Sequence, residues 1–184
     1  MNKNVIKRKF LAFLKDIIPV IVGILIALWL NNWNENRQDR LYIKKVYSAV
    51  QQDLYDSSVD ITLNLQRHQA YVDTLRAHLE NSSVSIMDIT TKSKGIYLPA
   101  IKISTLKAAA VSRPDLVDYQ KLAALADMEE QKEILSSKSD RLTDFVYSQS
   151  YETSKDKKEM LAILMADLMG TEKALQEIIE NFNK

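Results

Sequence analysis

The sequence of 184 residues contains no cysteine, three glycines and three prolines. Without cysteine, the chain forms no disulfide, no thiolate nucleophile and no cysteine-ligated metal centre. The absence identifies no compartment, because a cysteine-free chain is compatible with reducing and oxidising surroundings alike. The scarcity of glycine and proline leaves few turn signals, which favours a small number of long helices over many short strands.

An excess of charge of one sign is also missing. Lys and Arg number 25, Asp and Glu number 24, and the formal net charge is +1. A chain so balanced has no overall field that attracts nucleic acid or acidic substrates. We therefore expect no nucleic-acid partner.

Motifs that carry chemistry are scarce. The two histidines, His68 and His78, would lie about 80° apart around a helix and therefore share no ligand face. No paired Glu-x-x-His motif, glycine-rich phosphate loop or nucleophile elbow occurs. His68 falls on an apolar stripe, where we expect a hydrogen-bonded histidine between helices and not a metal ligand. We predict no catalytic residue, no cofactor and no metal site.

The chain does contain one long apolar run. Residues 17–30, "IIPVIVGILIALWL", carry no charged or polar side chain, and the uncharged stretch continues to residue 34. As a helix, residues 17–34 would extend for about 27 Å, close to the roughly 30 Å hydrocarbon core of a membrane. We predict a transmembrane helix over residues 17–34, after a basic and amphipathic segment over residues 1–16.

Two tryptophans mark the end of this run. Trp29 and Trp33 are one helical turn apart on one face, where indole rings can lie at the boundary between lipid and water. Asparagine side chains occupy the other faces, where hydrocarbon would strongly disfavour their amides. At the other end, the Lys15 side chain can extend toward the headgroups. We predict that Lys15, Trp29 and Trp33 lie at the membrane interface.

Two other interpretations of the run remain open. One is the buried helix of a soluble protein, whose length overlaps this range. The other is a cleaved signal peptide, because basic residues precede the run at positions 3, 7, 8 and 9. No small-x-small cleavage site follows the run, which favours an uncleaved signal-anchor.

Within the span, Gly23 and Ala27 form a small-xxx-small pair. Such a pair lets two helices approach closely in lipid, and we predict a membrane-helix contact at this face. Small residues are common in membrane spans, so chance is the alternative explanation.

Basic residues flank the run on both sides. Five precede it, and four follow within the next 15 residues, namely Arg37, Arg40, Lys44 and Lys45. The slight bias places the N-terminus in the cytoplasm and the body outside it. The four residues after the run are also candidate contacts for anionic lipid headgroups, with pairing to Glu35 and Asp39 as the alternative.

Beyond the span, apolar residues recur at helical spacing. They are Ile43, Val46 or Tyr47, Val50, Leu54, Ile61, Leu65, Val72, Leu75 and Leu79. Their period predicts one amphipathic helix over residues 35–80 that packs against helices of the same chain. The pattern has gaps at Ser57 or Ser58 and at His68.

Residues 81–103 break this pattern and are rich in Ser, Thr and Ile. We predict a crossover loop, in which "VSIMDI" and "IYLPAIKI" form short extended segments. Residues 104–184 would supply the remaining helices. Their expected boundaries are a short helix capped by Ser104 or Thr105, a longer helix capped by Ser112 with Pro114 in its first turn, and a last helix after a polar joint at residues 147–156.

The predicted fold class is therefore all-α. A single N-terminal transmembrane helix would precede an antiparallel bundle of about three long helices with a short extra helix.

The segment at residues 16–37, "DIIPVIVGILIALWLNNWNENR", resembles the amino-terminal signature of a family of small membrane proteins of Bacteroidota, a domain of unknown function. In that signature an acidic residue precedes an apolar run ending in "GILIAL", then two residues and "NNWNE". Pro19 and Trp29 depart from the pattern, and residues 104–125 are similar more loosely. The resemblance implies membrane attachment and helical architecture, and no activity. With the charge bias, it implies a bacterial inner membrane and a periplasmic body.

These observations predict a membrane-anchored, non-enzymatic protein that acts as an interaction or structural assembly subunit. The expected partners are the lipid bilayer and either another protein or a further copy of the chain. The crossover at residues 81–103 is the candidate contact region of the body. A ligand-sensing helical bundle outside the cytoplasm is the alternative, and an enzyme is the least favoured class, because no catalytic motif occurs.

Overall fold

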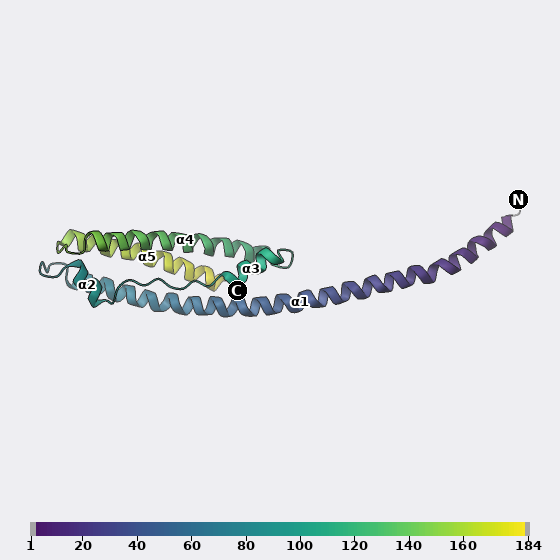
Figure 1. Ribbon diagram of the computed structural model, residues 1–184, viewed down its shortest axis with the longest axis horizontal. Coiled ribbons are helices and arrows are strands. Elements are labelled where there is room, and N and C mark those ends of the chain that lie inside the picture. The colour runs from purple at the N-terminus through teal and green to yellow at the C-terminus, as the bar shows by residue number, and fades with distance from the viewer. Residues whose placement is uncertain (1–2, 183–184) are drawn as a thin grey trace. The chain divides into compact units, whose positions relative to one another are not determined.

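The computed structural model describes the backbone of residues 3–182 and, from residue 17 to residue 182, every side chain. All regular elements in this range are helices (Figure 1): α1 (Lys3–Ala77), α2 (Ile86–Lys92), α3 (Ser104–Ser112), α4 (Tyr119–Ser148) and α5 (Lys155–Phe182). The predicted all-α fold class is therefore confirmed. Two compact units divide the chain, Met1–Lys45 and Val46–Lys184.

α1 contains both the apolar run and the amphipathic stretch that follows it. Pro19 lies inside this helix, although a proline there supplies no backbone N–H for a helical hydrogen bond. The predicted boundary between residues 34 and 35 is thus no break in secondary structure. The division between the two units falls instead after Lys45.

In the second unit, three long helical segments surround one hydrophobic core. Figure 1 shows α4 and α5 side by side as an antiparallel hairpin, joined by the turn at residues 149–154. The core positions recur at helical spacing, and they include Leu54, Ile61, Val72 and Leu75 of α1, Met128, Leu135 and Leu142 of α4, and Leu161, Met165, Leu168 and Leu175 of α5. Each buried side chain of this size contributes about 1.5–3 kcal/mol, so this core holds the bundle together.

The crossover contains a helix that the sequence analysis did not predict. "VSIMDI" is not extended, because a capping box starts α2 within it: the Asp88 N–H donates to Ser85 Oγ (3.2 Å) and the Ser85 N–H donates to Asp88 Oδ2 (2.9 Å). The N–H groups of Ile86 and Met87 donate to the carbonyls of Glu152 and Ser150 in the turn between α4 and α5. α2 is thereby attached to the end of the hairpin.

The predicted caps of the next two helices are wrong. α3 begins at Ser104 without any side-chain cap, because the Thr105 hydroxyl donates to Asp53 of α1 (2.5 Å) and not to its own helix. Residues 113–118 form a turn, and α4 begins at Tyr119, five residues after Pro114. Its cap is the Asp118 carboxylate, which accepts the Gln120 N–H at 2.8 Å.

Candidate functional site

The first candidate site is the apolar surface of α1 in the first unit. Every side chain from Ile18 to Leu30 is exposed, with Leu25 at 59% and Trp29 at 65%. Within the described residues, α1 is the single helix long and apolar enough to cross a membrane, and no residue of its most apolar window is buried. A core helix of a soluble protein would instead be mostly covered. The exposure of this window therefore gives no support to the buried-helix interpretation.

The predicted interface and helix-contact residues all lie on this surface. Lys15, Trp29 and Trp33 are exposed, as are Gly23 and Ala27. A Cβ added at Gly23 would meet no atom within 4 Å, so packing inside the chain does not require glycine there. The roles of these residues in a membrane remain predictions.

A shallow hollow of about 360 Å³ lies just beyond the tryptophans, lined by Trp33, Asn36, Arg37, Arg40 and Leu41. The Arg37 guanidinium lies over the Trp33 ring, with its central carbon 6.0 Å from the ring centroid. Lys44 and Lys45 are exposed and do not line this hollow. Across the described residues, none of these four basic side chains forms an ion pair with Glu35.

The second candidate site is a buried polar pair in the body. His68 of α1 and Glu172 of α5 are 2% and 0% exposed, and His68 Nδ1 lies 3.0 Å from Glu172 Oε2. His68 Nε2 lies 2.9 Å from the Tyr97 carbonyl oxygen, which only accepts hydrogen bonds. Nε2 therefore carries a proton, and one further proton lies between Nδ1 and Oε2.

Two oxygens, one in this pair and one on the residue four positions before His68, have no hydrogen-bond partner among the described residues. They are Glu172 Oε1 and Asn64 Oδ1, and both are buried. The Asn64 amide nitrogen donates one turn back, to the Asp60 carbonyl oxygen (2.9 Å). Buried polar atoms are normally paired, so this layer of the bundle is costly to form. It holds one histidine and one carboxylate, and no group of three metal-ligating side chains occurs among the described residues.

An extended segment, residues 96–103, runs alongside α1 in Figure 1. Side chains of α1 hold it there through hydrogen bonds. The Ala100 N–H donates to Asp60 Oδ2 (2.6 Å), and the Lys102 N–H donates to Ser57 Oγ (2.9 Å). Because helical side chains satisfy these amides, the segment needs no neighbouring strand. We call residues 96–103 the strap. Ser57 and His68, which interrupt the apolar pattern of α1, are therefore positions where α1 binds the strap.

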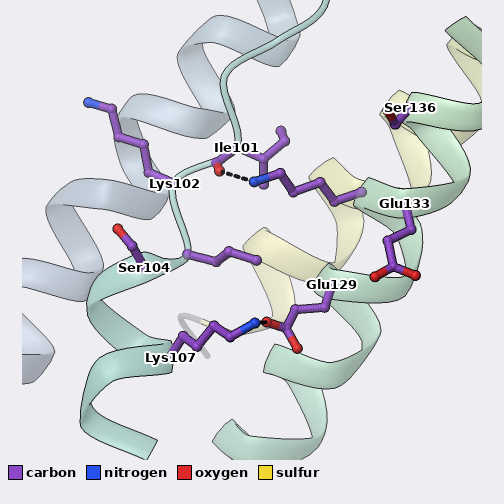
Figure 2. Close-up of a pocket in the computed structure, with 9 residues that line it drawn as sticks. Ile101, Lys102, Ser104, Lys107, Glu129, Glu133 and Ser136 are labelled. Carbon is purple, nitrogen blue, oxygen red and sulfur yellow. Dashed lines mark hydrogen bonds and ion pairs between the residues drawn. The ribbon is translucent and has the colours of Figure 1, made fainter. Parts of the chain in front are cut away.

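A charged hollow of about 610 Å³ lies between the strap, α3 and α4. Figure 2 shows Lys107 and Glu129 pointing toward each other, and Lys107 Nζ lies 2.6 Å from Glu129 Oε1. Lys132 Nζ donates a hydrogen bond to the Ile101 carbonyl oxygen (3.4 Å). Glu129 raises the pKa of the Lys107 ammonium, mainly through this hydrogen bond. Among the lining charges, Lys107 and Glu129 pair with each other, and Lys102 pairs with Asp56 outside the hollow. The residues that line the hollow include no histidine that could activate Ser104 or Ser136.

A buried lysine joins α5 to the end of α1. Lys158 Nζ donates to the carbonyl oxygens of His78 (2.9 Å) and Asn81 (2.8 Å), just beyond the last residue of α1. A cation at this place complements the partial negative charge of the helix C-terminus. Burial lowers the pKa of the Lys158 ammonium below its usual value.

The sequence analysis missed Asn64, Lys158 and Glu172. A signal for Glu172 was present, because it continues the core spacing of Leu168, Leu175 and Ile179 on α5. Comparison with protein-family models finds no match to this chain, and comparisons with curated proteins and with solved structures find none either. The resemblance to the Bacteroidota membrane-protein family therefore stays a prediction.

Proposed function

We propose that this chain is a single-pass membrane protein whose helical body serves as an interaction or assembly subunit without catalysis. The observation that carries the proposal is the exposure of the apolar run on α1. An apolar surface of this length is unfavourable in water and is covered either by lipid or by another protein. Its length, its aromatic end and its uncharged centre all fit lipid.

The proposed location is a bacterial inner membrane, with the N-terminus in the cytoplasm and the body in the periplasm. The basic residues before and after the run support this orientation, although their difference is one residue. The resemblance of residues 16–37 to a Bacteroidota family supports the compartment.

An interaction role is supported by an apolar surface on the body. Tyr55, Val59 and Leu63 follow one another at turn spacing on α1 and are 64%, 41% and 46% exposed. They line a hollow of about 400 Å³ together with Asp56 and Asp60 of α1 and with Ala100 and Lys102 of the strap. We call these three residues the Tyr55–Leu63 surface. Contiguous apolar surfaces of this kind are common at protein contacts.

Site-directed photo-cross-linking tests the interaction role. The chain has no cysteine, so Val59→Cys introduces a single attachment point for a benzophenone maleimide in native membranes. Asp127→Cys, at an exposed position on α4, is the matched control. We expect a discrete heavier product from position 59 and none from position 127, and its mass separates a second copy from another protein. The absence of any discrete product from position 59 would contradict the proposal.

A further inference from the structure

The hollow beyond the tryptophans combines two guanidinium groups with an aromatic ring on one side of α1. We propose that Trp33, Arg37 and Arg40 form a binding site for the phosphate group of an anionic lipid. We call these residues the Trp33–Arg40 site. The inference rests on the proposed membrane insertion and goes further, because it names the lipid chemistry that α1 recognises.

The geometry of the site favours a phosphate. The Arg37 guanidinium lies over the Trp33 ring, and this contact restricts the guanidinium. Neither Arg37 nor Arg40 forms an ion pair with another described residue, so their N–H groups remain available to a ligand. A guanidinium binds phosphate oxygens through two parallel hydrogen bonds, and two such groups within one turn can bind one phosphate together.

Depth distinguishes these arginines from the lysines that follow. If Trp33 marks the edge of the hydrocarbon, the helical rise places Arg37 about 6 Å and Arg40 about 10 Å beyond it. The headgroup layer is about 5–8 Å thick, and long arginine side chains reach back into it. Lys44 and Lys45 would lie about 16–18 Å beyond Trp33, past the phosphates. Those lysines can act on the membrane only through a field that salt screens over about 8 Å.

This difference in depth provides a matched pair of variants. Arg37→Gln/Arg40→Gln and Lys44→Gln/Lys45→Gln each remove two positive charges from exposed positions of the same helix. The full-length chain is reconstituted into nanodiscs of phosphatidylcholine. Phosphatidylglycerol is then titrated in, and its occupancy is measured by native mass spectrometry. Inorganic phosphate is titrated in a parallel arm.

We expect the wild-type chain to bind phosphatidylglycerol in preference to phosphatidylcholine. The arginine variant should bind phosphatidylglycerol roughly thirtyfold more weakly, because it lacks two basic residues that each contribute on the order of 1 kcal/mol. The lysine variant should stay within about twofold of wild type, because screening weakens distant charges. Inorganic phosphate should bind weakly to all three chains, because it lacks the acyl chains that the bilayer holds beside the site.

Four results would overturn the inference. Equal weakening in both variants would show a diffuse electrostatic attraction, and unchanged binding in the arginine variant would exclude the site. Binding of inorganic phosphate as strong as the binding of phosphatidylglycerol would identify a soluble anion as the ligand. Resistance of each chain to alkaline extraction is measured separately, in native membranes. A wild-type chain that is extracted contradicts the proposed function, whereas an inserted chain without lipid preference contradicts the Trp33–Arg40 site alone.

Discussion

His68 Nδ1 of α1 lies 3.0 Å from Glu172 Oε2 of α5, and the same histidine is hydrogen-bonded to the Tyr97 carbonyl of the strap. One imidazole thus connects two helices and the crossover segment. The connection is buried, so its loss cannot be compensated by water as it would be on the surface.

We predict that His68→Leu strongly destabilises the body. The substitution leaves the buried Glu172 without its partner, and the expected loss in free energy of unfolding is about 3–5 kcal/mol. Chemical denaturation of the full chain in detergent, followed by circular dichroism, measures it. Glu177→Gln, at an exposed position on the same helix, should change stability by less than about 0.5 kcal/mol.

The double variant His68→Leu/Glu172→Leu separates a lost partner from lost packing. Replacing both members of a buried pair by apolar residues removes the uncompensated charge, so it should recover a large part of the loss seen in His68→Leu. A double variant as unstable as the sum of the two single variants would contradict the pairing.

Ser57→Ala should loosen the strap. Ser57 is fully buried, and the change removes the acceptor of the Lys102 N–H, leaving that amide unpaired at a cost of about 1–3 kcal/mol. We expect faster tryptic cleavage after Lys94 and Lys102 than in the wild-type chain. The neighbouring Ser58→Ala is the control, because the Ser58 side chain has no such role, and its cleavage rate should match that of wild type. Equal rates in all three chains would show that this bond does not hold the strap.

The capping box of α2 should stabilise the folded chain by an amount that depends on pH. Hydrogen bonds from the Ser85 hydroxyl and backbone N–H lower the pKa of the Asp88 carboxyl below its usual 3.8. The folded pKa lies below the unfolded one, so this stabilisation is complete above about pH 4 and is lost as the pH falls through the folded value. The difference in stability between wild type and Asp88→Asn should therefore shrink from pH 5 toward pH 2. A difference that does not change over this range would contradict it.

Labelling of single cysteines should report the orientation. Ser148→Cys places a thiol at an exposed position at the end of α4, and Asn4→Cys places one before the apolar run. We predict that a membrane-impermeant maleimide added to spheroplasts labels position 148, and that position 4 reacts only after lysis. The opposite pattern would place the body in the cytoplasm and reverse the proposed topology.

The sequence was sufficient to predict the long helices and insufficient to predict the residues at which helices begin and end. Periodicity predicts long helices because one face must be apolar, and this constraint repeats over many residues. A cap depends on one side chain. The Thr105 hydroxyl binds Asp53 of another helix, and no local pattern indicates that choice.

The buried face of a helix is also ambiguous where apolar residues are adjacent. On α5, Met160 and Ile163 stand at helical spacing with Leu164, yet they are 47% and 62% exposed, whereas Leu161 and Met165 are buried. Both choices satisfy helical spacing, and packing against the other helices decides between them. Packing also decides which polar residues are buried. Ser57 and His68 interrupt the apolar pattern of α1 and are nonetheless buried.

Alkaline carbonate extraction of native membranes tests the central claim, that the apolar run of α1 is buried in lipid. Carbonate releases chains that are held to membranes by charge or by other proteins and leaves helices that cross the bilayer. We predict that the intact chain stays in the membrane pellet. Leu25→Lys, which costs about 2.5–3.5 kcal/mol at the centre of a span, should move part of it to the supernatant. Release of the intact wild-type chain into the supernatant would contradict the account.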